Sequence, residues 1–437
     1  MDTDRPDLQL PSRFLARSVT RRDLVHRGGV AGLALGAAVV TGPNLRASAQ
    51  EATPVVASPV ASPVASDGAQ FAYVGTYTTE APGGSGELAS VGISVFAVDA
   101  AGGLTPVQTV ASANPSFLAL SVDQSVLYAI NEIADFEGGD TGSIEAYAID
   151  AASGQLTLIN RVDSGGSIPA HLAVDPTGSF LVVANYVGSN YVVLPIRDDG
   201  GLDAVSGTVQ QEGSGPNEER QEAPHPHAVV FDPSGGFVAG ADLGIDQIAT
   251  FSLDAATGEL VPASEVSAAP GAGPRHLAFH PDGAVLYAIN ELDATITAYA
   301  FDAATGAIGA EIQTVSTVPD GFEGTKSTAE IFVHPSGQFL YGSNRGMEDA
   351  PSAEANSIVA FSIDEASGAL TLIGWATEGI DFPRNFAIDP TGTWLYVCNQ
   401  QGDDIVQFLI DPATGALSAT GLVTTSPTPV CLVFKSA

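Results

Sequence analysis

The chain has 437 residues, of which 45% are hydrophobic and only 15% charged, and it contains 48 glycines and 28 prolines. Acidic residues outnumber basic ones by 50 to 15, which gives a formal net charge of −35 at pH 7. So acidic a surface repels nucleic acid and anionic membranes, and the turn-rich composition favours many short strands over helices.

Residues 1–49 are typical of an export signal. Arg21 and Arg22 form a twin-arginine pattern, residues 28–41 are small and apolar, and Ala47-Ser48-Ala49 matches a cleavage site. We therefore expect a twin-arginine (Tat) signal peptide, with no stable membrane span after its removal and a periplasmic or extracellular location. Retention of the segment as an anchor is the alternative.

Residues 50–69 form a Pro/Ala/Ser-rich stretch with repeated Ala-Ser-Pro-Val, which predicts a flexible spacer before a domain over residues 70–437. Without residues 1–49 the chain keeps eight basic and 46 acidic residues, a net charge of −38. The two cysteines, Cys398 and Cys431, form no metal-binding cluster. Because Tat substrates fold in a reducing compartment, we expect two free, buried thiols.

A unit of about fifty residues recurs six times from residue 117 onward. Each copy has a short apolar strand, a turn of the Asp-Pro-x-Gly type, a second strand that usually ends in Asn, and two further strands. The turns begin at Ser121, Asp175, Asp232, His280, His334 and Asp389. Four antiparallel strands per repeat indicate the blade of a β-propeller. The apolar first strands predict that the innermost strand is buried on both faces.

A seventh copy is divided between the two ends of this domain. Residues 71–110 match the second, third and fourth strands of a blade, and residues 429–434 match its first strand. We therefore expect an all-β, seven-bladed β-propeller, whose ring is closed by the C-terminal strand completing the first blade. Closure removes the exposed edges of an open sheet.

The repeat also predicts where a site would form. The first two strands of a blade are antiparallel, so the start of the first and the end of the second lie at one mouth of the central channel. Three of the six arginines that follow residue 49 fall at these positions, together with His, Glu and Tyr residues. The candidates are His171, Tyr186, His227, Arg275, His276, Glu291, Glu330, Arg345, Arg384 and Glu132.

Structural interpretations compete with this one. The Asn residues next to these positions (Asn131, Asn290, Asn344 and Asn399) are expected to cap strand ends, and the Asp and His residues of the turns also look structural. The charged candidates could instead form ion pairs between blades. His225 and His227, separated by one residue, should point to opposite faces of a strand, so we expect no metal there. Motifs of serine hydrolases, P-loop proteins and zinc proteases are missing from the sequence.

Four ordered motifs carry a family resemblance: PHPH, GPRHLAFHPDG followed by INE, AEIFVHPSG followed by SNRG, and FPRNFAIDPTG followed by CNQ. With these, residues 70–435 resemble the lactonase family of seven-bladed propellers, which includes the propeller-type 6-phosphogluconolactonases and the fungal muconate-lactonizing enzymes. The resemblance implies metal-free lactone chemistry without a cofactor. It also implies catalytic roles for His227, Arg275, Glu291 and Arg345.

The remaining candidates (His171, Tyr186, His276, Glu330, Arg384 and Glu132) are then expected to bind substrate. Arginines would stabilise the oxyanion that develops in ester hydrolysis, and His227, Glu291 or Glu330 would act as the base. The expected substrate is a sugar lactone, phosphorylated or not, and the oligomeric state stays open. The alternatives are a non-catalytic exported binding protein, a muconate-type cycloisomerase and a calcium-dependent lactonase. We expect the groups at the mouth to be partly hydrated.

Overall fold

The computed structural model describes most of the domain that the repeats define. The described residues are 69–79, 90, 92–325, 327–346 and 355–436. The expected signal peptide lies outside them, and so does the spacer apart from Ala69, which begins the first strand.

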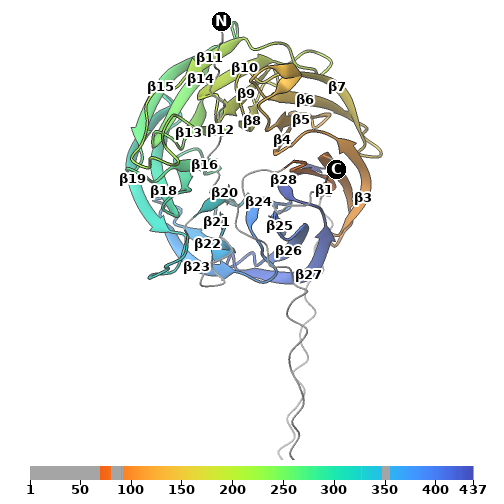
Figure 1. Cartoon of the computed structure of the whole chain (residues 1–437). Coiled ribbons are helices and arrows are strands. Elements are labelled where there is room, and N and C mark those ends of the chain that lie inside the picture. The colour runs from red at the N-terminus through yellow and green to blue at the C-terminus, as the bar shows by residue number, and fades with distance from the viewer. Residues whose placement is uncertain (1–68, 80–89, 91, 326, 347–354, 437) are drawn as a thin grey trace, which may run out of the picture. The chain divides into compact units, whose positions relative to one another are not determined.

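Seven four-stranded antiparallel sheets surround a central channel, which confirms the predicted seven-bladed propeller (Figure 1). Blade 1 contains β28 (Pro429–Ser436), β1 (Ala69–Thr76), β2 (Gly92–Val98) and β3 (Leu104–Ala111). Blade 2 contains β4 (Phe117–Leu120), β5 (Val126–Asn131), β6 (Ser143–Ile149) and β7 (Leu156–Asp163). Blade 3 contains β8 (Pro169–Val174), β9 (Phe180–Asn185), β10 (Asn190–Pro195) and β11 (Gly207–Gln210).

The other four blades follow in the same order, from the channel outward. Blade 4 contains β12 (Pro226–Phe231), β13 (Val238–Asp242), β14 (Gln247–Leu253) and β15 (Leu260–Ser267). Blade 5 contains β16 (Pro274–Phe279), β17 (Val285–Asn290), β18 (Thr295–Asp302) and β19 (Ala307–Ser316). Blade 6 contains β20 (Thr328–Val333), β21 (Phe339–Asn344), β22 (Ser357–Ile363) and β23 (Leu370–Ala376). Blade 7 contains β24 (Pro383–Ile388), β25 (Trp394–Asn399), β26 (Asp404–Ile410) and β27 (Leu417–Thr425).

Besides these strands, a short 3₁₀ turn, η2 (Phe136–Gly138), lies in the loop after β5. No helix in the described part of the chain is long and apolar enough to cross a membrane.

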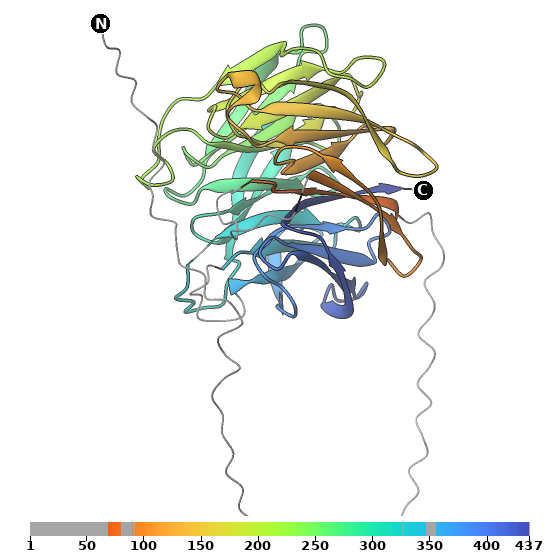
Figure 2. The same ribbon diagram turned by 45° about the vertical axis from the view of Figure 1, so that its right-hand side comes forward.

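The ring closes as the sequence predicts. Strand β28 pairs antiparallel with β1, with Val74 opposite Leu432 and Ala72 opposite Phe434. Figure 2 shows this C-terminal strand, in blue, beside the orange strands of blade 1. The first and last strands of the domain therefore belong to one sheet.

The two cysteines are free, buried thiols, as expected. Cys431 lies on β28 and Cys398 on β25.

The deepest strand of each blade is the second and not the first, contrary to the expectation from apolar sequence alone. Strands β5, β9, β17 and β21 are buried at every residue, whereas β12 and β16 become partly exposed over their last two residues. The first strands line the channel, so one of their faces meets its interior. The second strands lie between the first and third strands and pack against the neighbouring blades on both faces.

A tyrosine hydroxyl joins neighbouring blades at five of the seven junctions. In each case the tyrosine lies on a second strand and donates to the carbonyl of a glycine in the outer turn of the next blade. The pairs are Tyr73–Gly154, Tyr128–Gly200, Tyr287–Gly368, Tyr341–Gly415 and Tyr396–Gly102. These glycines have φ between 69° and 80°, a region that other residues rarely occupy. These outer turns of the blades therefore also connect neighbouring blades.

The Asp-Pro-x-Gly turns are structural, as expected. The Asp389 carboxylate accepts the backbone N–H groups of Thr391, Thr393 and Trp394. Asp175 and Asp232 bind their own turns in the same way. His280 and His334 instead reach the next blade, where each lies within 2.9 Å of a glycine carbonyl oxygen. We call these five residues, Asp175, Asp232, His280, His334 and Asp389, the turn ring.

Candidate active site

The positions selected by the repeat come together at one mouth of the channel. Contacts connect all ten candidates into clusters that span blades 2 to 7. Arg384 meets Glu132 across the gap between blades 7 and 2, with 3.9 Å between Nη2 and Oε2. We call the ten residues the mouth ring: Glu132, His171, Tyr186, His227, Arg275, His276, Glu291, Glu330, Arg345 and Arg384.

Glu291, which follows β17, is surrounded by three arginines. Its Oε2 lies 3.0 Å from both Arg275 Nε and Arg345 Nη2, and its Oε1 accepts from Arg220 Nη2 at 2.7 Å. Burial alone would raise the pKa of Glu291, but the three guanidinium groups hold this pKa well below its usual range. Glu291 is therefore ionised at any physiological pH, and both its oxygens are occupied.

Two of these arginines also bind backbone carbonyls of strand β20 in blade 6. Arg275 Nη1 donates to the Ala329 carbonyl at 2.8 Å, and Arg345 Nη2 donates to that of Thr328 at 2.7 Å. Arg275, Glu291 and Arg345 are only 2–5% exposed, so our expectation that the groups at the mouth are partly hydrated is wrong for them. The predicted ion pairs between blades do form, and they do so inside the candidate site.

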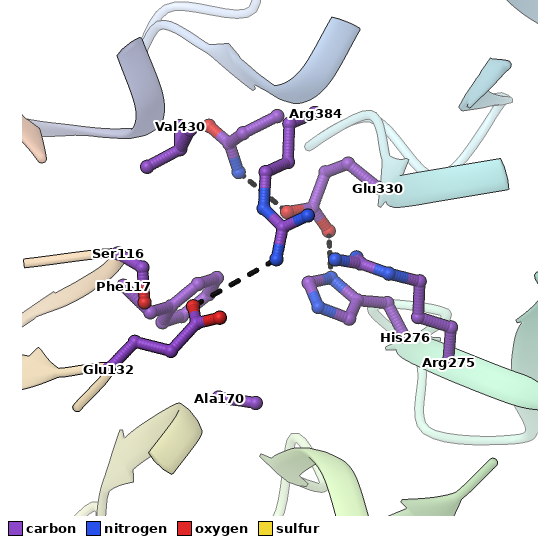
Figure 3. A pocket seen from close by; sticks show the side chains of 10 residues that line it. Ser116, Phe117, Glu132, Ala170, Arg275, His276, Glu330, Arg384 and Val430 are labelled. Carbon is purple, nitrogen blue, oxygen red and sulfur yellow. Dashed lines mark hydrogen bonds and ion pairs between the residues drawn. The ribbon is translucent and has the colours of Figure 1, made fainter. Parts of the chain in front are cut away.

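A pocket opens next to this cluster, and a different part of the mouth ring lines it. Figure 3 shows Arg384 reaching toward Glu132, while Glu330 lies beside His276 and Arg275. The complete lining is Ser116, Phe117, Glu132, Ala170, Arg275, His276, Glu330, Arg384, Asn385 and Val430. Of the four residues to which the resemblance assigns catalysis, only Arg275 lines this pocket.

The contacts of the Arg384 guanidinium with its neighbours are long. Besides its long contact with Glu132, its guanidinium lies over the ring of Tyr77, 5.2 Å from the centroid. The Tyr77 hydroxyl donates to Glu132 Oε2 at 2.8 Å, and burial raises the pKa of Tyr77. Arg384 therefore keeps donors with which to bind an oxygen of a ligand in the pocket.

Three histidines meet at the opposite wall. The His276 ring lies 5.1 Å from that of His171 and 5.2 Å from that of His227, measured between centroids. Burial is the main reason that the pKa values of all three lie well below their usual range, and the nearby arginines lower those of His227 and His276 further. The three imidazoles are therefore neutral, and neutral imidazole can accept a proton.

Glu330, on β20, is a carboxylate that lines the pocket, and its surroundings differ from those of Glu291. Its Oε1 lies 2.8 Å from His276 Nδ1, and its Oε2 accepts from Asn385 Nδ2 at 2.6 Å. Burial raises the pKa of Glu330 to about 7, against a partial lowering by its hydrogen bonds and by Arg275. One mouth therefore holds a permanently charged carboxylate and another that titrates near neutrality.

The two histidines of the PHPH segment turn to the same side, as residues i and i+2 of an extended chain do. His225 precedes β12, and a register shift separates Pro226 from Ala228. The His225 ring stacks on Tyr186 with 4.3 Å between centroids, and the His227 ring meets the same tyrosine edge-on at 5.5 Å. The prediction that the two histidines face apart is therefore wrong. No group of three possible metal ligands occurs among the described residues.

Buried polar atoms without a partner collect at this mouth. Within the described part of the chain such atoms occur in nine side chains, among them His227 Nδ1, His276 Nε2 and Arg345 Nε. The others belong to Ser116, Asn185, Asp242, Asn290, Gln400 and Ser426. Except for Ser426, all lie at repeat positions at the start of a first strand or the end of a second one. Buried polar groups are rarely left unsatisfied, so this mouth is where water or a ligand would bind.

Sequence reasoning missed three functional neighbours. Arg220 lies on the connection between β11 and β12, outside the repeat, and only its contact with Glu291 identifies it. Tyr77 follows the split blade's β1, where the repeat count was not applied. Asn385 occupies a position that the count did select, but nothing in its residue type distinguished it from the capping asparagines.

Comparison with known proteins gives the same family as the motifs. Residues 71–434 match the family described as lactonase, 7-bladed beta-propeller. A 6-phosphogluconolactonase of Bacillus subtilis is 35% identical over 364 residues, which cover 83% of this chain and 97% of that relative. A 6-phosphogluconolactonase of Formosa agariphila is 35% identical over 76% of this chain and 90% of its own length.

A solved structure, that of the periplasmic gluconolactonase PpgL of Pseudomonas aeruginosa, aligns with a TM-score of 0.74 at 31% identity, over 83% of this chain and 98% of that one. The chain therefore belongs to the lactonase family of seven-bladed β-propellers.

Proposed function

We propose that the protein is an exported enzyme that hydrolyses a sugar lactone at the mouth of its channel. The observation that carries the proposal is the pocket in which two arginines, a neutral histidine and a carboxylate converge from blades 5, 6 and 7. Family membership supports it, because relatives at 35% identity are named 6-phosphogluconolactonases. Lactone hydrolysis needs an activated water and a site for the oxyanion, and the pocket contains groups suited to both.

Arg384 and Arg275 are suited to polarise the carbonyl. Arg384 keeps most of its donors, and Arg275 uses Nε and Nη1 on the protein, which leaves Nη2 for a ligand. Guanidinium groups that are already fixed in place stabilise a developing negative charge without reorganising. The proposal therefore assigns stabilisation of the oxyanion to these two residues and needs no metal ion.

Glu291 is unsuited to act as the base, because arginines occupy both its oxygens. We assign it the role of holding Arg275 and Arg345 in place. Arg345, which does not line the pocket, would then act through this cluster. His227, with one unpartnered ring nitrogen, stands behind His276 and completes the histidine wall.

An unphosphorylated sugar lactone fits the protein better than a phosphate ester. Three of the four arginines at the mouth are bound to one carboxylate, and the part of the chain after residue 49 carries a net charge of −38. Long-range repulsion would slow the approach of a phosphorylated anion. The solved relative PpgL is itself called a periplasmic gluconolactonase, which is consistent with an exported enzyme of this kind.

Export would depend on the twin-arginine segment. A chain in which Arg21 and Arg22 are both replaced by Lys should stay in the cytoplasm, whereas the native chain should appear outside it with residues 1–49 removed. Fractionation followed by N-terminal sequencing measures both. Appearance of the double-Lys chain outside the cytoplasm would show that another signal directs export.

Turnover of glucono-δ-lactone and of its 6-phosphate, each with and without EDTA, tests the activity. We expect hydrolysis of the unphosphorylated lactone that EDTA does not affect. Loss of activity with EDTA would show a metal-dependent lactonase. Activity on neither lactone, together with a partner captured at the mouth, would favour the non-catalytic binding protein. Closure of a muconate to its lactone would indicate the cycloisomerase.

A further inference from the structure

The geometry points to His276 as the catalytic base of this pocket, acting through Nε2, with Glu330 and Asn385 as positioning residues that set its tautomer. This inference rests on the proposed lactone hydrolysis and goes beyond it. Nothing in the motifs distinguishes His276 from its two histidine neighbours. A chain of hydrogen bonds that runs from Leu432 through Asn385 and Glu330 determines which nitrogen of His276 carries the hydrogen.

The chain begins at the closing strand. The backbone N–H of Leu432 donates to Asn385 Oδ1 at 3.0 Å, and a backbone N–H can only donate. The amide of Asn385 therefore has one orientation, with Oδ1 toward Leu432 and Nδ2 toward Glu330. From there Nδ2 donates to Glu330 Oε2 at 2.6 Å.

Glu330 is in this way surrounded by donors. Its Oε1 accepts the backbone N–H of Ile331 at 3.0 Å, and its Oε2 accepts from Asn385. A carboxylate that receives fixed donors on both oxygens is stabilised in its ionised, acceptor-only form. It therefore presents an acceptor to His276 Nδ1, 2.8 Å away, and selects the tautomer in which Nδ1 carries the hydrogen.

The other nitrogen of the same ring is then a bare lone pair. His276 Nε2 is buried and has no hydrogen-bond partner among the described residues, and His276 lines the pocket. The neutral imidazole is favoured because burial and the nearby arginines lower the pKa of His276. A base held by a carboxylate on one nitrogen and open on the other is the arrangement that general-base catalysis requires.

The reaction balances with water alone. Nε2 takes a proton from a water molecule while the water oxygen bonds to the lactone carbonyl carbon and the π electrons move to the carbonyl oxygen beside Arg275 and Arg384. When this intermediate collapses, the ring C–O bond breaks and the leaving oxygen takes the proton from Nε2. One water is consumed, the product is the open hydroxy acid, and nothing is oxidised or reduced.

The titratable groups that face His276 and Glu330 belong to the mouth ring, apart from two cysteine thiols. His276 is faced by Glu330, Glu291, His171, His227, Arg275, Arg345 and Arg384, and Glu330 is faced also by the thiols of Cys398 and Cys431. Among these, Glu330 is the carboxylate whose pKa lies at about 7. Activity that needs ionised Glu330 falls as the pH falls through this value, so kcat/KM should show an acid limb near pH 7.

Glu330→Gln tests the assignment. An amide cannot accept from both Asn385 and His276 Nδ1, so Gln at this position disturbs the tautomer. We expect kcat for glucono-δ-lactone to fall by about 10²–10⁴, the usual contribution of general-base catalysis, and the acid limb to disappear. Asn385→Asp, which keeps the acceptor for Leu432 but adds a negative charge beside Glu330, should instead move the acid limb to higher pH.

Glu145→Gln is the matched control, because Glu145 is a fully buried carboxylate of blade 2 that binds Arg161, Ser112 and Tyr147 outside the pocket. Its loss should reduce stability and leave the pH profile unchanged. Nitrogen NMR of histidine-labelled protein supplies a readout independent of turnover, and we expect hydrogen on Nδ1 of His276. Hydrogen on Nε2, or an acid limb that survives in Glu330→Gln, would overturn the inference. An inactive native protein would instead refute the proposed function itself.

Discussion

The two rings of the propeller use the same repeat in opposite ways. At the turn ring each blade does the same thing, because a side chain satisfies its own turn or the turn of the next blade, and none of the five residues has an unpartnered buried atom. At the mouth ring each blade contributes a different residue. Unpartnered buried atoms remain there, and one carboxylate binds three arginines.

This difference shows how a symmetric scaffold acquires a function. Repetition supplies equivalent backbone positions around the channel. The strands form in every blade although the residue types at these positions differ. Groups that satisfy one another stabilise the structure, whereas groups left incomplete are available to a ligand. A departure from the repeat at one end of the strands is therefore more informative than any residue type taken alone.

We expect the largest effect from removing the closing strand β28, because it completes the propeller that carries both rings. Deleting residues 429–437 takes away β28, leaves β1 without its inner partner and removes the donor to Asn385. We expect this chain to lose cooperative unfolding and activity together. Circular dichroism and a thermal melt measure the first. A truncated protein that melts with the full-length one would refute closure within a single blade.

Glu291→Gln should damage the mouth ring in both respects. Removing one partner of a buried ion pair typically costs about 3–5 kcal/mol, because the remaining charges stay buried and uncompensated. Three arginines here depend on one carboxylate, so we expect a clearly lower melting temperature together with loss of most turnover. Unchanged stability would mean that the mouth is more hydrated than its burial indicates.

Arg384→Gln should separate activity from stability. Arg384 contacts Glu132 only at 3.9 Å and lies over Tyr77, so the fold depends on it little. Loss of one donor fixed toward an oxyanion typically reduces the rate about 10²–10³-fold. We expect such a fall in kcat with a melting temperature near that of the native protein. The reverse pattern, a large drop in stability with normal turnover, would make Arg384 structural.

Asp389→Ala probes the turn ring. Three backbone N–H groups lose their acceptor, and leaving buried groups unsatisfied costs about 1–3 kcal/mol. We expect the melting temperature to fall while kcat/KM stays at the native value, because the turn lies at the other end of the strands from the pocket. A parallel loss of activity would show that the two rings are coupled.

The smallest effect is one of pH and salt. Burial raises the pKa values of Glu330 and Asp242 to about 7, so the folded protein binds more protons than the unfolded chain between about pH 4 and 7. The stability from these two groups is complete at the acidic end and is lost as the pH rises through 7. His171, His227 and His276 oppose this below about pH 6.5, because the unfolded chain then binds protons that these buried, neutral side chains do not. Glu291, whose pKa is held low in the folded protein, opposes it only near the acidic end of the range.

We therefore expect the melting temperature to rise as the pH falls from 8 to 6.5, above the range in which the histidines oppose the two carboxyl groups. Added salt should raise it at pH 8 by screening the net negative charge. A melting temperature that falls over the same change of pH would contradict the assignment of both raised pKa values.

The fold was readable from sequence because a blade cannot bury its apolar strands alone, so its pattern must recur. The same recurrence located the mouth and the closing strand. The sequence did not predict which strand of a blade is most buried. The first strands are apolar, but they are less buried than the second strands, which lie between the first and third. Arg220 escaped because a connection outside the repeat carries it to Glu291. The different acidities of Glu291 and Glu330 depend on three-dimensional neighbours that spacing does not encode.

The position of the closing strand in the sequence also determines when the site can form during synthesis. Leu432 is synthesised after all six undivided blades, and its N–H group orients Asn385 and, through it, Glu330 and His276. A nascent chain with six complete blades therefore still lacks an ordered site. We therefore expect the site to be completed only after β28 has been made, and a chain that stops before residue 432 to be inactive however well its other blades have formed.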